Sequence, residues 1–106
     1  MTVIVMLLLM FVLNGEAQCK TLHAIGAGAN ASCKAWLSER ELKDYFDLAN
    51  WGLGYLSGVS ELSGEHDAIH GIDNHRILYW LDGYCRANPR RLFVDGLDSF
   101  IAAHPG

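Results

Sequence analysis

The chain has 106 residues, of which 51% are hydrophobic, and its 12 acidic and 8 basic side chains give a net charge of −4 at neutral pH. Nucleic-acid binding normally needs a basic patch, so this charge balance argues against nucleic acid as a partner. The length suits one small domain, close to the lower size at which a hydrophobic core alone gives adequate stability.

Residues 1–17 have the pattern of a signal peptide. An unbroken apolar run covers residues 3–13, which is too short to cross a bilayer core of about 30 Å as a helix. Gly15 and Ala17 then place small residues at the two positions that signal peptidase reads, so we predict cleavage after Ala17. The alternative is a retained N-terminal anchor, since no Lys or Arg precedes the apolar run. Export predicts a periplasmic or secreted protein that is not stably inserted in a membrane after cleavage.

A flexible leader is predicted for residues 18–31, because a composition rich in Gly, Ala, Ser and Asn buries too little apolar surface to order itself. Cys19 lies just after the predicted cleavage site. The sequence leaves open whether this cysteine is free, paired between chains or lipidated. A single folded domain is then expected over residues 32–106.

Helical periodicity dominates this domain, and we predict an all-α fold, a small bundle of about four helices. Residues 32–62 have apolar side chains at spacings of three and four, which favours helix over strand. Ser38 and Glu41 form a capping-box pattern that divides this block into a short helix and a longer one. The longer helix is expected to be the central one of the fold.

Two more helices follow in the C-terminal third of the chain. Asp73 is a good N-cap for the first of them. Asn88 and Pro89 are expected to end that helix and to start the last one, which runs to about His104.

Small residues mark one face of the long predicted helix. Gly54 and Gly58 are four residues apart, with Trp51 and Ser57 beside them, and a glycine inside a helix costs about 1 kcal/mol. We therefore predict a close helix crossing at this helix-packing face. The pattern fits neither a dinucleotide fingerprint nor a serine-hydrolase elbow, because the residues that flank Ser57 differ from both motifs.

Histidines and acids gather in residues 65–75. His66 and His70 are four residues apart, a spacing that can chelate a transition metal on a helix, with His75 or an acid completing the set. The alternative is a solvated acidic loop that binds no metal. A zinc hydrolase of the zincin type is disfavoured, because Asp67 stands where that motif has its general-base Glu.

Cys33 and Cys85 are predicted to form a disulfide bond. A cysteine pair that spans most of a small exported domain is more typical of a structural crosslink than of a reactive centre. Closing this loop of roughly fifty residues stabilises the fold by about 4 kcal/mol in the chain-entropy estimate. We find no catalytic set and predict a protein that is not an enzyme and holds no cofactor.

Three segments form a distinctive combination: Ser32-Cys33-x-x-Trp36, Trp51-x-Leu53-Gly54-Tyr55-Leu56-Ser57-Gly58 and Trp80-Leu81-Asp82-x-Tyr84-Cys85-Arg86-Ala87-Asn88-Pro89. Over residues 25–104 they resemble a group of small, mostly uncharacterised secreted proteins of Gram-negative bacteria. The Tyr-Cys-x-x-Asn-Pro segment is similar to that of the HdeA/HdeB periplasmic acid-stress chaperones, which are helical and have one disulfide bond. The Gly-Tyr-Leu-Ser-Gly helix and the Asn-Pro-Arg-Arg-Leu turn are similar to the Tai-type immunity proteins, which neutralise peptidoglycan amidase effectors in the periplasm.

The resemblance implies a protein that binds other proteins, and three hypotheses follow. In a stress or client-binding protein, acid would charge His66, His70 and His75, neutralise nearby carboxylates and expose apolar surface. An immunity-type protein would hold an effector on the acidic loop or on the glycine-marked face. A metal-binding protein would use the loop that carries His66 and His70.

Overall fold

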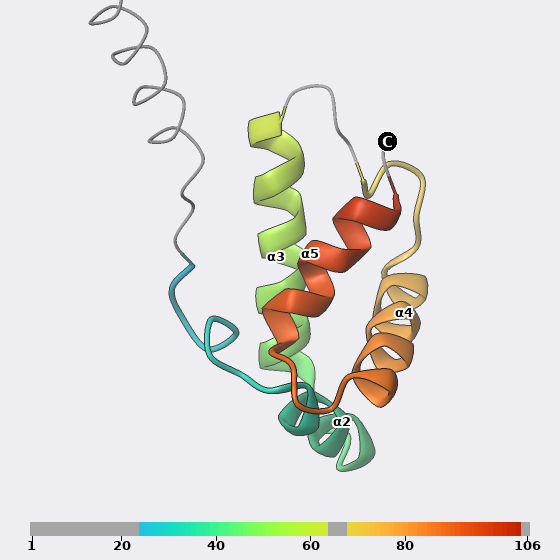
Figure 1. Cartoon of the computed structure of the whole chain (residues 1–106). Helices are drawn as coiled ribbons and strands as arrows, with labels where there is room; N and C mark the ends of the chain where they lie inside the picture. The colour runs from blue at the N-terminus through green and yellow to red at the C-terminus, as the bar shows by residue number, and fades with distance from the viewer. Residues whose placement is uncertain (1–23, 64–67, 105–106) are drawn as a thin grey trace, which may run out of the picture.

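Four α-helices make up the part of the chain that the computed structural model describes, residues 24–63 and 68–104. They are labelled as in Figure 1 and run over Cys33–Glu41 (α2), Phe46–Ser63 (α3), Asn74–Ala87 (α4) and Phe93–Ala103 (α5). The predicted all-α bundle is confirmed. The predicted signal peptide and Cys19 lie outside the described residues. No helix within the described ranges combines the length and hydropathy needed to cross a membrane.

The centre of the bundle is α5, which packs on each of the other three helices. Figure 1 shows α2 lying across one end of α3, α4 and α5. The prediction that the longest helix is central is therefore wrong. The reason lies in the apolar residues of α5, because Phe93, Leu97 and Phe100 are all buried and form a continuous stripe along this short helix.

The hydrophobic core combines side chains from all four helices. Trp36 and Phe93 are both fully buried, and their ring centroids lie 4.9 Å apart where α2 meets α5. The remaining buried apolar residues are Cys33, Leu48, Ala49, Leu56, Ala68, Ile77, Leu78, Leu81, Cys85, Leu97 and Phe100.

Two glycines allow the helices to approach closely. A Cβ atom built on Gly52 of α3 would lie 3.0 Å from Cζ of Phe93, and one built on Gly96 of α5 would lie 2.9 Å from Cδ1 of Tyr84. These are the positions where α3 and α4 approach α5. An alanine at either site would force the aromatic ring to move.

The helix boundaries differ from the predicted ones at two turns. Ser38 lies inside α2, and this helix ends only at Glu41. A turn follows, in which Lys43 has a φ of 57°. Asn88 ends α4, as expected, and its side-chain amide donates to the carbonyl of Tyr84 over 2.9 Å. A turn then separates α4 from α5, so Pro89 does not begin the last helix.

Part of the predicted leader, residues 24–31, packs against the folded domain. The indole Nε1 of Trp51 donates to the carbonyl of Ile25 over 2.8 Å. Gly28 is buried against the same indole, and a Cβ atom there would clash with the ring of Trp51. The packed region therefore begins before Ser32, because tryptophan supplies apolar surface that the leader composition lacks.

Candidate functional site

A disulfide bond joins the first residue of α2, Cys33, to Cys85 in the last turn of α4. Both cysteines are fully buried, and their Cα atoms lie 4.8 Å apart. The predicted disulfide is confirmed. It places a covalent link at the junction of α2 and α4, next to the polar groups described below.

A short backbone bridge holds the start of α2 against the start of α5. The N–H of Cys33 donates to the carbonyl of Arg91, and the N–H of Phe93 donates to the carbonyl of Ala31, each over 2.8 Å. These bonds pair two N–H groups that helix N-termini would otherwise leave without a partner. The start of α2 is thus fixed to both α4 and α5.

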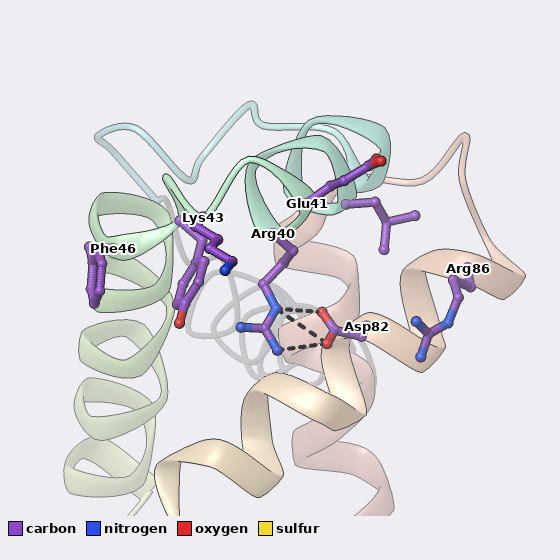
Figure 2. A pocket seen from close by; sticks show the side chains of 8 residues that line it. Arg40, Glu41, Lys43, Phe46, Asp82 and Arg86 are labelled. Atoms are coloured by element: carbon purple, nitrogen blue, oxygen red, sulfur yellow. Dashed lines mark hydrogen bonds and ion pairs between the residues drawn. The ribbon is translucent and has the colours of Figure 1, made fainter.

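One carboxylate lies inside the junction of α2 and α4. Asp82 is 7% exposed and is the one buried charged residue among residues 24–63 and 68–104. Arg40 of α2 donates to it from two nitrogens, with Nε 3.0 Å from Oδ1 and Nη2 2.8 Å from Oδ2 (Figure 2). A planar, two-point ion pair of this kind fixes the relative position of its partners better than a single contact does.

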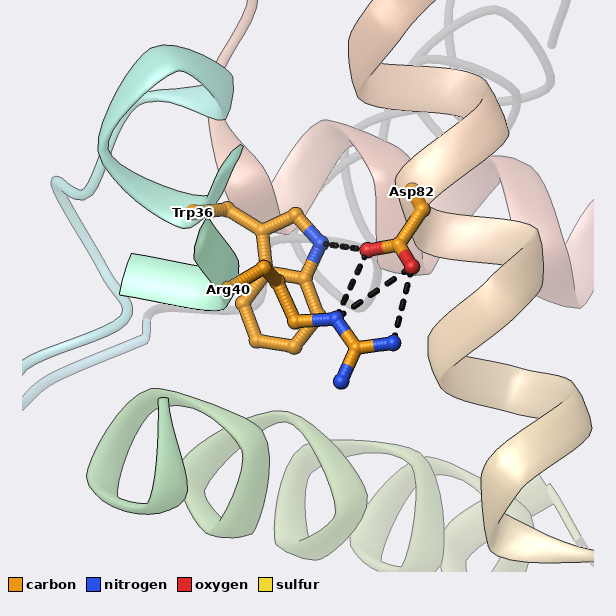
Figure 3. Close-up of polar contacts among 3 residues, drawn as sticks. All are labelled: Trp36, Arg40 and Asp82. Carbon is orange, nitrogen blue, oxygen red and sulfur yellow. Dashed lines mark hydrogen bonds and ion pairs between the residues drawn. The ribbon is translucent and has the colours of Figure 1, made fainter. Parts of the chain in front are cut away.

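Trp36 completes this polar cluster. Its indole Nε1 donates to Oδ1 of Asp82 over 2.8 Å, so one oxygen of the carboxylate accepts from both Trp36 and Arg40 (Figure 3). Within the described part of the chain, no buried side-chain nitrogen or oxygen lacks a hydrogen-bond partner. The Trp36–Arg40–Asp82 cluster therefore satisfies its own buried polar atoms, as a buried carboxylate requires.

Arg40 is also held by aromatic rings. Its guanidinium carbon lies 4.5 Å from the ring centroid of Tyr45 and 5.5 Å from that of Trp36. Hydrogen bonding to Asp82 raises the pKa of Arg40 above its ordinary value, against the smaller opposing effect of burial. The guanidinium is therefore charged at any physiological pH.

An open hollow of about 710 Å³ lies over this cluster. Arg40 and Asp82 belong to its wall (Figure 2). The other residues that line it come from the end of α2, the following turn, the start of α3 and α4: Leu37, Glu41, Lys43, Tyr45, Phe46 and Arg86.

The rim of the hollow is both cationic and apolar. Lys43 and Arg86 are exposed, and neither forms an ion pair with any residue in the described ranges. Phe46 is 65% exposed and stacks on Tyr45, with the ring centroids 5.0 Å apart. Leu42, in the turn beside it, is 73% exposed. This combination can hold a ligand that carries both negative charge and apolar surface.

The predicted metal site falls partly outside the described residues, because His66 is not among them. His70 lies in a turn, followed by Gly71 with a φ of 71°, and His75 lies in the first turn of α4. Among residues 24–63 and 68–104, no three His, Cys, Asp or Glu side chains come together as a metal site would require. Metal binding through His66 stays a prediction.

The predicted helix crossing at Gly54 and Gly58 is wrong for the described residues, none of which comes within 4 Å of a Cβ atom built on either glycine. The buried stripe of α3 contains Leu48, Ala49, Gly52 and Leu56, and the two predicted glycines lie on the other side of the helix. Of their predicted companions, Trp51 packs on residues 24–31, and the exposed Ser57 donates to the carbonyl of Leu53 in its own helix.

The Trp36–Arg40–Asp82 cluster was not predicted. One signal for it exists in the sequence, because Asp82 lies on the same helical stripe as Leu78, Leu81 and Cys85, all of which are buried. An acidic residue on an apolar stripe usually has a buried partner. The identity of that partner depends on the packing of α2 against α4, which no local pattern reveals.

Comparison with known proteins gives no match, whether against family models, curated proteins or solved structures. The function of the site is therefore inferred from its own residues.

Proposed function

We propose that the protein is a small exported helical protein, not an enzyme, that binds other proteins in the periplasm and is loosened by acid to hold stressed clients, as HdeA/HdeB-type proteins do. The disulfide bond supports export, because such bonds form and persist in oxidising compartments. The observation that carries the proposal is the buried Asp82 carboxylate, which both Trp36 and Arg40 use as their acceptor.

Acid is expected to weaken the contacts within the Trp36–Arg40–Asp82 cluster. The attraction of Asp82 to Arg40 and Trp36 depends on the negative charge of its carboxylate and on the capacity of that carboxylate to accept hydrogen bonds, and an acid that removed this charge would weaken both contacts. Arg40 stays charged under these conditions, because its pKa is raised from a value already far above neutral. The other charged groups around the hollow are Glu41, Lys43 and Arg86.

The disulfide bond does not respond to acid, so α2 stays tethered to α4 while the polar contacts between them are lost. The ring of Trp36, which belongs to α2, contacts the rings of Tyr45 and Phe93. Loosening of α2 would expose this apolar surface while the disulfide bond keeps α2 attached to α4. Exposed apolar surface on a tethered helix is what a client-binding protein needs.

Binding of an apolar dye as a function of pH tests the proposal. We expect dye fluorescence to rise sharply between about pH 6 and about pH 3, with the disulfide bond intact. The D82N variant should bind dye already at neutral pH and change much less on acidification. In the control variant E61Q, which loses an exposed carboxylate on α3, the wild-type curve should be retained. A flat response of the wild-type protein would contradict the proposal.

A second candidate function, immunity-type binding of an effector at neutral pH, is favoured by the hollow. Lys43 and Arg86, which have no ion-pair partner among residues 24–63 and 68–104, and the exposed Phe46 form a surface that is available in the closed fold. Capture of one stoichiometric partner from a periplasmic extract at neutral pH, lost in a K43E/R86E variant, would favour this function over acid-dependent client binding.

A further inference from the structure

We propose that the hollow over the Trp36–Arg40–Asp82 cluster binds an acidic segment of a partner protein. Carboxylates of that segment would meet Lys43, Arg86 and the outer face of Arg40, and its apolar side chains would pack on Phe46 and Leu37. The inference rests on the proposed protein-binding function and names the chemistry of the partner.

The charge of the hollow is opposite to that of the chain. Three cations, Arg40, Lys43 and Arg86, line it together with two acids, Glu41 and Asp82, which gives a local charge of +1 (3 − 2). The whole chain carries −4. The hollow attracts acidic segments locally, although the net negative charge of the chain repels them, so acidic segments are directed to the hollow.

Arg40 is already in position for a ligand. Asp82 holds its Nε and Nη2 atoms, and the ring of Tyr45 packs against the guanidinium. The remaining nitrogen, Nη1, makes no hydrogen bond with any residue in the described part of the chain. A ligand carboxylate that binds there does not have to order this side chain, which reduces the entropy cost of binding.

Lys43 and Arg86 extend the cationic surface to both sides of the Arg40–Asp82 pair. Figure 2 shows them on either side of that pair, Lys43 on the turn after α2 and Arg86 on α4. Since neither has an ion-pair partner among the described residues, a carboxylate that reaches one of them replaces water rather than an existing salt bridge. The two cations also define a direction along which an extended acidic segment can lie.

The apolar residues of the hollow favour a protein segment over a small anion. Phe46 presents a largely exposed ring, stacked on Tyr45, and Leu37 lines the same hollow. A small anion would leave these side chains uncovered. Arginine and aromatic residues together are the composition typical of the energetically important centre of a protein interface.

Backbone-amide NMR titration at neutral pH tests the inference with a defined probe. The probe is an acetylated and amidated peptide, Gly-Asp-Phe-Glu-Leu-Gly, and the matched control peptide has Asn and Gln in place of Asp and Glu. We expect the acidic peptide to shift the amide signals of Leu37, Arg40, Lys43 and Arg86 at millimolar concentration, and to bind about tenfold more tightly than the control peptide. Its affinity should fall as salt is added.

Charge reversal then locates the site. The K43E/R86E variant should lose the shifts, whereas the R90E/R91E variant, which changes the net charge equally at exposed arginines outside the lining, should keep them. Equal binding of both peptides, shifts away from the hollow, or no binding of the acidic peptide would overturn the inference. None of these outcomes bears on acid-dependent dye binding, which fails or succeeds independently at low pH.

Discussion

The junction of α2 with α4 and the junction of α3 with α5 are held by different forces. A disulfide bond and the Asp82 cluster connect α2 to α4. At the other junction, Gly52 of α3 lets the rings and methyl groups of Phe93 and Leu97 approach closely, and the hydroxyl of Tyr55 donates to Asp98 at the edge over 2.6 Å.

This difference follows from how much apolar surface each helix can bury. Only Cys33 and Trp36 are buried in the nine residues of α2, whereas four residues of the longer α3 are buried. A short helix with so small a buried face needs covalent and polar links to stay in place. The stability of the α2–α4 junction should therefore be sensitive to reduction and to acid. The stability of the α3–α5 junction should be sensitive to changes of side-chain volume.

Loss of the disulfide bond should have the largest effect. We expect the C33S/C85S variant to lose about 2 to 5 kcal/mol of unfolding free energy, because its unfolded chain is no longer cross-linked. Urea denaturation of the variant, compared with the oxidised wild-type protein, measures this loss. An unchanged urea midpoint would show that the crosslink does not hold α2 in place.

Removal of the buried carboxylate should come next. The D82A variant leaves the indole N–H of Trp36 and the guanidinium of Arg40 without their acceptor, and we expect a loss of about 2 to 4 kcal/mol at neutral pH. The exposed E61A variant should change the unfolding free energy by less than about 0.5 kcal/mol. If the two substitutions cost the same, the Asp82 cluster contributes nothing specific to the junction.

Side-chain volume should affect stability at the junction of α3 with α5. An alanine at position 52 meets the ring of Phe93 at 3.0 Å, so G52A should destabilise the protein by about 1 to 2 kcal/mol. The matched G54A variant places its methyl group in open space, and should stabilise the helix by about 0.5 to 1 kcal/mol. Thermal unfolding of both variants distinguishes the two faces of α3, and opposite signs are expected.

The smallest effect concerns Tyr55 and appears only at high pH. Burial, and after it the hydrogen bond to Asp98, raises the pKa of Tyr55 to about 12. Since the folded-state pKa is raised, the stability that this group contributes is complete below about pH 10 and is lost as the pH rises through about 12. In a spectroscopic tyrosine titration, D98N should lower the midpoint of Tyr55 only in part, because burial remains. No change in D98N would show that the hydrogen bond is unimportant.

The sequence was sufficient to predict the helical class, because helix periodicity is a local pattern, and the disulfide bond, because the predicted domain contains only two cysteines. Periodicity identified the helices, and Cys33 and Cys85 were the two cysteines inside the predicted domain. The glycine face was misassigned because spacing alone pointed to Gly54 and Gly58. Gly52, in register with Leu48 and Leu56, fits the buried stripe instead.

The Asp82 cluster shows the limit of such reasoning. Its members are separated by 42 and 46 positions in the chain, and they meet only because α2 crosses the end of the bundle. The hollow above them depends on the same crossing. Contacts of this kind arise from the tertiary packing of helices, which helix periodicity does not specify.

An NMR titration of the indole N–H signals tests the central claim most directly. The indole of Trp36 donates to the carboxylate of Asp82, whereas that of Trp51 donates to the backbone carbonyl of Ile25, which does not titrate. On acidification with the disulfide intact, we expect the Trp36 signal to shift or broaden before the Trp51 signal changes. If both signals stay unchanged on acidification, or change together, acid does not loosen the contact between Trp36 and Asp82 first and the account of the α2–α4 junction is contradicted.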